Sequence, residues 1–193
     1  MHLYRRGALP DPSLPTIAIV GTRQITPYGR YVTQQFTKEL VAAGFVIVSG
    51  FMYGVDAVAH ETCIDNGGKT IAVLGYGLDA PYYPRSHALL AKKLLAHGSC
   101  LVSEYAPHVH AHASHFPRRN RIVSGLSLGV LVTEAAVRSG TMITARLAAE
   151  QGREVFAVPG PFDSLYSEGT KELVNQGAKL VTSIHDIVDE LHF

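Results

Sequence analysis

The chain lacks tryptophan, has only two cysteines among its 193 residues, and contains no long hydrophobic run. Cys63 and Cys100 are too few for a disulfide framework and do not form a CxxC metal motif, so we expect buried thiols in a reducing compartment. No run of about 18 apolar residues occurs, and the first residues lack the apolar region of a signal peptide. The sequence therefore predicts a soluble, cytoplasmic protein with no membrane partner.

Charge of either sign is not in excess, because 17 Lys and Arg residues nearly balance 16 Asp and Glu residues and leave a net charge of +1. A protein that binds a polyanion over its whole surface is usually more basic, so nucleic-acid binding would need a local cluster. The segment Phe116–Arg121 is such a cluster, with three arginines in four positions behind an aromatic ring. On a helix Arg118 and Arg121 share one face, and Arg119 is turned about 100° from its neighbour. Guanidinium groups suit phosphates and the ring suits a base, but a solvated helix start with ion pairs fits the charge pattern equally well.

Several nucleotide-binding and catalytic motifs are also missing. Neither GxGxxG after the first predicted strand nor GxxxxGK[ST] occurs, so we expect no NAD, ATP or other cofactor. GxSxG is absent and no Ser/His/Asp set stands out by spacing, so the chain is not predicted to be an enzyme. Glu104 and Glu134 are better explained as residues that orient an arginine or cap a helix than as a catalytic pair. Asp56 and His60 lie four positions apart, where we expect a mutual hydrogen bond.

Short apolar runs alternate with amphipathic stretches along the whole chain. The runs are almost wholly apolar, as expected for parallel strands that are covered by helices on both faces. The pattern predicts an α/β fold with a single doubly wound, mostly parallel, Rossmann-like sheet over residues 16–193, preceded by an extended N-terminal arm over residues 1–15. The predicted strands are 16–20, 45–49, 70–74, 99–103, 128–133, 154–158 and 179–182; the predicted helices are 26–44, 54–66, 85–97, 139–151, 170–176 and one from residue 184.

Ligands of such sheets bind beyond the carboxyl ends of the strands. Gly21, Thr22 and Arg23 follow the first predicted strand and offer close backbone approach, N–H and O–H donors, and charge. Ser139–Thr141 opens a helix, whose unpaired N–H groups favour an anion. Together these residues predict a phosphate-binding rim, although a tight turn at Gly21 and a plain N-cap at Ser139 explain each part alone.

A further loop is rich in histidine. His108, His110, His112 and His115 fall on alternate or near-alternate positions, which invites a metal site. No cysteine and few carboxylates accompany them, so we favour a solvated loop and predict no metal.

A set of short motifs, in this order, resembles the DNA-processing protein A family (DprA, also called Smf). The resemblance runs from about residue 3 to residue 191. The motifs are Val20–Arg23; Ser49–Gly50 with Gly54–Asp56 and Ala59–His60; Ile71–Leu74 with Gly77; Tyr83–Pro84; Ser103–Glu104; Phe116–Pro117 with Arg119–Arg121; Glu134 with Ser139–Gly140 and Thr144–Ala145; and Val158–Gly160.

The resemblance implies a homodimeric Rossmann-like domain that binds single-stranded DNA without strong sequence preference. It also implies loading of RecA recombinase onto incoming strands during natural transformation, a competence process that ends in DNA recombination. Many members carry a helical N-terminal domain and a winged-helix C-terminal domain, for which this length leaves no room. Carried over by motif, the phosphate pocket would be Gly21, Thr22 and Arg23; the stacking and basic wall Phe116, Arg118, Arg119, Asn120 and Arg121; and the anion-binding helix start Ser139, Gly140 and Thr141.

Two alternatives use the same rim. One is a nucleotide-processing phosphoribohydrolase of the lysine-decarboxylase-like (LOG) group, whose Pro-Gly-Gly-x-Gly-Thr-x-x-Glu signature compares with residues 134–141 and the residues that follow. That segment lacks the glycine pair and the final Glu. The other alternative is a sensor of free nucleotides.

Overall fold

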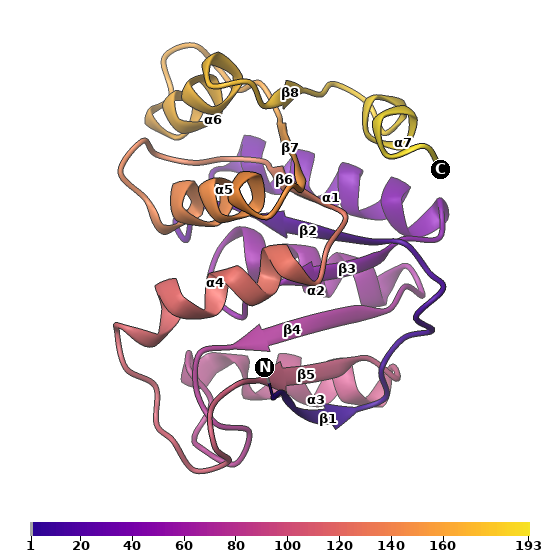
Figure 1. The fold of residues 1–193 in the computed structure, drawn as a ribbon, viewed down its shortest axis with the longest axis vertical. Coiled ribbons are helices and arrows are strands. Elements are labelled where there is room, and N and C mark those ends of the chain that lie inside the picture. The colour runs from indigo at the N-terminus through magenta and orange to yellow at the C-terminus, as the bar shows by residue number, and fades with distance from the viewer. Residues whose placement is uncertain (1) are drawn as a thin grey trace.

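The computed structural model describes residues 2–193, which form one eight-stranded sheet flanked by helices (Figure 1). The strand order is β1-β5-β4-β3-β2-β6-β7-β8, parallel throughout except for β1, which is antiparallel to β5. The strands are β1 (Tyr4–Gly7), β2 (Thr16–Val20), β3 (Val46–Ser49), β4 (Thr70–Leu74), β5 (Cys100–Ser103), β6 (Gly129–Val132), β7 (Glu154–Ala157) and β8 (Lys179–Leu180). The helices are α1 (Pro27–Ala42), α2 (Val55–Asp65), α3 (Ala88–Ala96), α4 (His115–Gly125), α5 (Gly140–Glu150), α6 (Leu165–Asn175) and α7 (His185–Leu191), with a 3₁₀ turn at Arg85–His87.

The predicted doubly wound, mostly parallel sheet is confirmed. Alternate residues of β2 face opposite sides, and both sides are buried. Ala18 and Val20 pack in a cluster with residues of α4, α5 and α6. Ile17 and Ile19 pack with residues of α1, α2 and α7. The apolar runs therefore reflect burial on two faces, as expected for parallel strands.

Local signals account for most element boundaries. The Thr26 side chain accepts a hydrogen bond from the Gly29 N–H at 3.0 Å, and Pro27 is the first residue of α1. Gly44, at φ 87°, follows that helix. The helix expected at residues 170–176 begins earlier, at Leu165, because Ser164 caps it by accepting from the Tyr166 N–H.

The N-terminal segment adds an edge strand to the sheet. The sequence suggests only an extended arm there, whereas Tyr4–Gly7 pairs with Cys100–Ser103 of β5. The four residues are half-buried or exposed in alternation, with two arginines among them, so they carry no apolar signal. Division into an arm and a core domain stays a prediction.

The strands that follow β2 lie on both sides of it in the sheet, with β3, β4 and β5 on one side and β6, β7 and β8 on the other. Such a switch in strand order opens a crevice beyond the carboxyl ends of the central strands. Within residues 2–193, no helix is long and apolar enough to cross a membrane.

Candidate functional site

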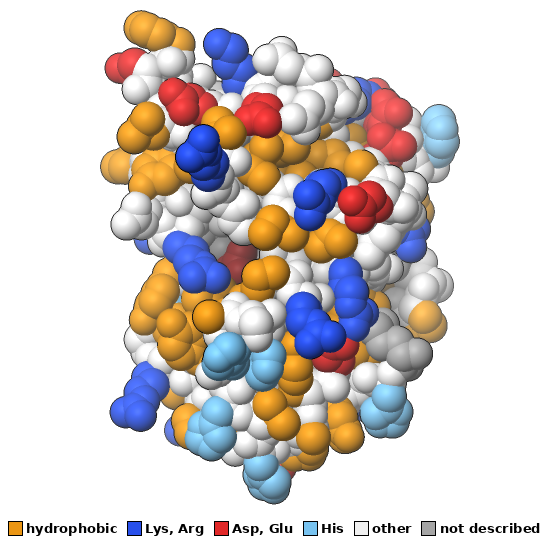
Figure 2. All heavy atoms as spheres, turned by 60° about the vertical axis from the view of Figure 1, so that its left-hand side comes forward, with side chains coloured by type: hydrophobic (Ala, Val, Ile, Leu, Met, Phe, Trp, Pro, Cys, Tyr) orange, Lys and Arg blue, Asp and Glu red, His pale blue; other side chains and the backbone are white. Residues whose placement is uncertain are grey.

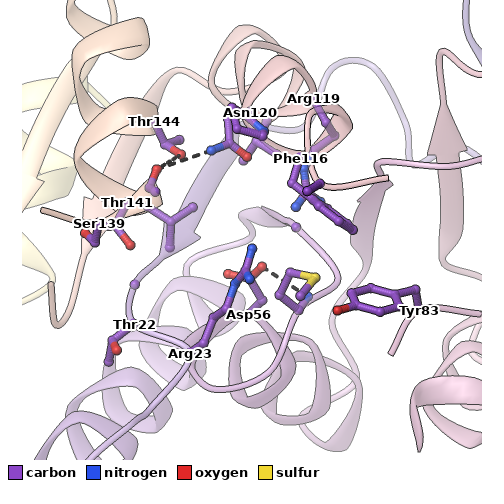
Figure 3. A pocket seen from close by; sticks show the side chains of 18 of the residues that line it. Thr22, Arg23, Asp56, Tyr83, Phe116, Arg119, Asn120, Ser139, Thr141 and Thr144 are labelled. Carbon is purple, nitrogen blue, oxygen red and sulfur yellow. Dashed lines mark hydrogen bonds between the residues drawn. The ribbon is translucent and has the colours of Figure 1, made fainter. Parts of the chain in front are cut away.

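A cavity of about 670 Å³ lies at this switch point, between the loop after β2 and the N-terminal ends of α4 and α5 (Figure 3). Of the predicted site residues, Arg118 and Arg121 do not line it. Those that do are Gly21, Thr22, Arg23, Phe116, Arg119, Asn120, Ser139, Gly140 and Thr141. Lining residues that the sequence prediction did not include are Gly50, Met52, Asp56, Tyr83, His112 and Thr144, among others.

The loop after β2 is held tightly by its backbone. A Cβ on Gly21 would lie 2.5 Å from Val55 Cγ2 and 2.8 Å from the Glu134 carbonyl oxygen, so a side chain is excluded there. The Thr22 N–H, expected to face a ligand, instead donates to the Glu134 carbonyl at 2.8 Å. The Thr22 Oγ1 accepts from the Gln24 N–H at 3.1 Å, which leaves its O–H proton as the donor for a ligand. Thr22 therefore mainly stabilises the loop after β2.

Aromatic and guanidinium groups meet at one side of the cavity. The Arg23 guanidinium carbon lies 5.8 Å from the centroid of the Phe116 ring, within the range of a cation–π contact. The Tyr83 ring lies 5.4 Å from the same ring with an interplanar angle of 36°. Arg23 and Tyr83 are both exposed, so this side offers flat apolar surface and positive charge to solvent.

Arg119 lies at the floor of the cavity and is only 3% exposed. One of its terminal nitrogens donates to the Val73 carbonyl, and its Nε has no hydrogen-bond partner among residues 2–193. Burial lowers the pKa of Arg119, while the nearby Asp56 carboxylate opposes that shift. A buried guanidinium with an unused N–H is costly unless a ligand accepts from it.

Asp56 is the buried counter-charge of Arg119. Its Oδ2 accepts from the Met52 N–H at 3.2 Å (Figure 3). Burial raises the pKa of Asp56, and Arg119 offsets part of that rise. A Cβ on Gly50 would collide with the Asp56 carboxylate and lie 2.8 Å from both terminal nitrogens of Arg119. The Asp56 carboxylate and the Arg119 guanidinium therefore both lie close to Gly50, and a larger residue there would collide with them.

The N-terminal end of α5 supplies further donors. Ser139 is the N-cap residue of α5, as the plain interpretation expects, but its side chain makes no capping hydrogen bond. Its Oγ is buried and has no partner in the described part of the chain. Asn120 Nδ2 and Thr144 Oγ1 donate to the Gly140 carbonyl at 3.2 and 3.3 Å, which ties α4 to the start of α5 (Figure 3). With the helix-start N–H groups, the Ser139 hydroxyl and the Arg119 Nε are donors at this end of the cavity that no residue of the described chain uses.

Arg118 and Arg121 lie outside this cavity. Arg118 is exposed, and Arg121 forms an ion pair with Glu104. The prediction that Arg119 points in a different direction from Arg118 and Arg121 is confirmed. Of the three arginines, it is Arg119 that lines the cavity.

The carboxylates do not form a catalytic pair. Glu104 orients Arg121. Glu134 is 2% exposed and accepts from the backbone N–H of Thr26 at 3.0 Å and from its hydroxyl, at the start of α1. Neither carboxylate lines the cavity, so the explanation by arginine orientation and helix capping holds for both.

The hydrogen bond expected between Asp56 and His60 is not formed. The His60 ring nitrogens instead contact the Gly50 carbonyl oxygen at 2.6 Å and Thr70 Oγ1 at 2.8 Å, because the ring turns into the core beneath the cavity. Burial lowers the pKa of His60 to about 4. In the described chain, residues 2–193, no group of three His, Cys, Asp or Glu side chains is placed to hold a metal ion.

The fold and this set of donors define a Rossmann-like α/β protein with a cavity lined by hydrogen-bond donors at its switch point. Within that class, the family model of DNA recombination-mediator protein A matches residues 1–192, and the chain belongs to this family.

Known proteins of this family are similar over most of the chain. It is 50% identical to Protein Smf of Escherichia coli K12 over 177 residues, which is 92% of this chain and 47% of that protein. It is 46% identical to the DNA processing protein DprA of Bacillus subtilis over 175 residues, which is 91% of this chain and 58% of that protein. The chain therefore spans about half the length of these curated relatives.

Solved structures of similar proteins have the same fold. The DprA structure from Streptococcus pneumoniae superposes with a TM-score of 0.91 at 41% identity, covering 99% of this chain and 66% of that one. DNA processing protein A of Helicobacter pylori, described for its single-stranded DNA binding mode, gives a TM-score of 0.84 at 32% identity over 98% of this chain and 86% of that one. A molybdenum cofactor binding protein from Rippkaea orientalis, at 18% identity and a TM-score of 0.64, shares the fold.

Proposed function

We propose that this chain binds single-stranded DNA and acts as a recombination mediator. The observation that carries the proposal is the cavity in which the exposed Tyr83 ring, the half-buried Phe116 ring and two arginines meet the unpaired Ser139 hydroxyl at the start of α5. Sequence-tolerant binding of a single strand needs charge contacts to the backbone and an aromatic platform for the bases. The relative from Helicobacter pylori, described for its single-stranded DNA binding mode, supports this function.

In this proposal the residues divide the work. Phe116 and Tyr83 stack a base, and Arg23 neutralises a phosphate at the mouth of the cavity. Arg119 and the start of α5 hold an anionic or acceptor group deeper inside. The net charge of +1 then suffices, because binding depends on a local site.

The proposal extends to partners. By the resemblance, the chain forms a homodimer and delivers the bound strand to RecA recombinase in natural transformation. A pull-down of RecA that depends on single-stranded DNA tests the partner independently of strand binding.

Binding to an oligo-dT strand, measured by fluorescence anisotropy from 50 to 300 mM salt, tests the function. We expect micromolar or tighter binding, weaker binding to duplex DNA, and a decline with salt of about 0.7 log units per log unit of salt for each phosphate contact. Arg23→Ala should weaken binding about tenfold and reduce that slope. Arg30→Ala, which removes an exposed arginine outside the cavity, is the matched control. Salt-independent binding would contradict the proposal.

The enzyme alternative is not favoured. Its catalytic carboxylate would have to be Glu134, which is buried against Thr26 and does not line the cavity. A thermal-shift comparison of AMP with oligo-dT separates the remaining nucleotide-sensor alternative, since a sensor would be stabilised by AMP alone.

A further inference from the structure

The histidine-rich loop before α4 reaches the cavity at one residue. His108, His110 and His112 are all exposed, but only His112 lines the cavity. Figure 2 shows several histidine side chains on the same face of the molecule as a group of Lys and Arg side chains. The loop therefore brings one titratable ring to the site and leaves two others outside it.

The backbone around His112 is fixed rather than loosely attached. The Gly77 N–H donates to the Val109 carbonyl at 2.8 Å, and the Asp79 N–H donates to the Pro107 carbonyl at 2.7 Å. The His112 carbonyl itself accepts from the His115 N–H at 2.9 Å, at the start of α4. These bonds tie both ends of the loop to neighbouring elements, so the ring is positioned at modest entropic cost.

The hydrogen bonds of His112 assign its tautomer. Its Nδ1 accepts from the Ser114 N–H at 3.4 Å and lies 2.8 Å from the Ser114 Oγ. Because a backbone N–H only donates, Nδ1 carries the lone pair, and in the neutral ring the proton sits on Nε2. The ring thus presents an N–H donor on the edge that Ser114 does not occupy.

We propose that His112 Nε2–H binds a phosphate oxygen of the DNA strand at the cavity mouth and takes up a proton when the strand binds. This inference rests on the proposed function and adds a residue and a pH dependence to it. A bound phosphate places negative charge beside the ring and favours the imidazolium, whose hydrogen bond to phosphate is charge-assisted. Upon protonation Ser114 Oγ serves as the acceptor for Nδ1–H, since a hydroxyl both donates and accepts.

Other groups around His112 contribute to the pH response and must be separated from it. The guanidinium groups of Arg23 and Arg119 keep their charge across the physiological pH range. The side chains of Asp56, Tyr83 and His115 are titratable. The pKa of the buried carboxyl is raised by burial. The groups are Arg23, Asp56, Tyr83 and Arg119 in the cavity wall, and His115, whose ring centroid is 5.6 Å from that of His112.

The test measures the affinity for a labelled oligo-dT strand at pH 7.5 and pH 6.0 and constant ionic strength. At pH 7.5, His112→Ala should weaken binding about fivefold, the value of one ordinary hydrogen bond. At pH 6.0 the loss should reach about thirtyfold, because the wild type gains a charge-assisted bond. His112→Gln keeps an N–H donor that does not titrate, so it should lie within about twofold of the wild type at pH 7.5 and gain less on acidification.

His110→Ala is the matched control, since it removes an exposed histidine of the same loop outside the cavity. It should bind like the wild type at both pH values. The proposal is overturned if His112→Ala matches the wild type, if His110→Ala loses as much, or if His112→Gln keeps the full gain at pH 6.0. An abasic strand should show the same loss with His112→Ala; a loss seen only with bases present would overturn the phosphate contact. A wild type that binds no strand at either pH would overturn the proposed function as well.

Discussion

Gly50 decides the shape of the cavity floor. Any Cβ at this position would collide with the Asp56 carboxylate and press on both terminal nitrogens of Arg119. Gly50→Ala should therefore separate the two charges, destabilise the fold by about 1–3 kcal/mol and weaken strand binding by more than the stability loss explains. Denaturant unfolding and anisotropy on the same samples measure both effects. Gly125→Ala, where the nearest atom would be 3.7 Å away, should leave both unchanged. Full affinity in Gly50→Ala would show that the floor does not contact the strand.

His60, next to that floor, should make the fold sensitive to acid. Burial lowers its pKa from 6.5 to about 4, so the unfolded chain binds more protons between these values. Stability due to neutral His60 is fully present above pH 6.5 and declines as the pH falls toward 4. Between pH 7.5 and 5 the loss should be about 2 kcal/mol. Unfolding of His60→Gln should lack this slope, whereas the exposed-site variant His97→Gln should keep it. A wild-type slope retained in His60→Gln would assign the acid sensitivity elsewhere.

Individual site residues could be predicted where a side chain suited to a phosphate or a base stands at a strand end or a helix start. Nine of the eleven predicted residues line the cavity, because strand ends and helix starts meet at the switch point of a parallel sheet. Arg118 and Arg121 fall outside it, since charge alone does not say which helix face turns inward. Asp56 and Gly50 were missed as site residues because their proximity to Arg119 joins two segments that are distant in the sequence, which no local pattern encodes.

At the scale of elements, the loop after β6 holds the start of α1. Glu134 receives the N–H and hydroxyl of Thr26, the residue that caps this helix. Glu134→Gln should destabilise the fold by about 1–2 kcal/mol, because a buried carboxylate acceptor is replaced by an amide. Strand affinity should stay within about twofold, since this side chain does not line the cavity. A double-mutant cycle with Thr26→Ala checks the coupling. Loss of binding without loss of stability would instead assign Glu134 to the site.

The elements themselves were largely predictable, since the strands of a parallel sheet buried on both faces give short runs that are almost wholly apolar. The exceptions have no such signal. Strand β1 has the sequence Tyr-Arg-Arg-Gly and only one neighbouring strand, so nothing in it distinguishes a strand from a loop. Helix α6 starts at Leu165 through the Ser164 cap, ahead of the apolar residues that mark its buried side.

At the scale of the whole molecule, large apolar side chains are exposed near the β8 edge of the sheet. Near β8 the side chains of Phe162, Leu165 and Leu180 are 100%, 70% and 47% exposed. Exposed large apolar side chains favour association, and a two-fold interface uses the same surface on both copies. We therefore place the proposed homodimer at this edge, where α6 is separated from α4 by α5 (Figure 1).

Leu165→Glu puts a charge at this edge of the sheet, and a two-fold interface there brings the same charge on the other copy close to it. The dimer should weaken at least tenfold, because an unpaired buried carboxylate costs more than 1.4 kcal/mol. Light scattering over a concentration series measures the shift to monomer. Leu89→Glu, at a side chain 64% exposed on α3 near the other edge, is the matched control and should leave the mass unchanged. If Leu89→Glu dissociates the dimer and Leu165→Glu does not, the interface lies at the β1 side.

With the interface at β8, each monomer of Leu165→Glu keeps an intact cavity and should still bind short strands. Longer strands should bind more weakly, because they lose the gain of two linked sites.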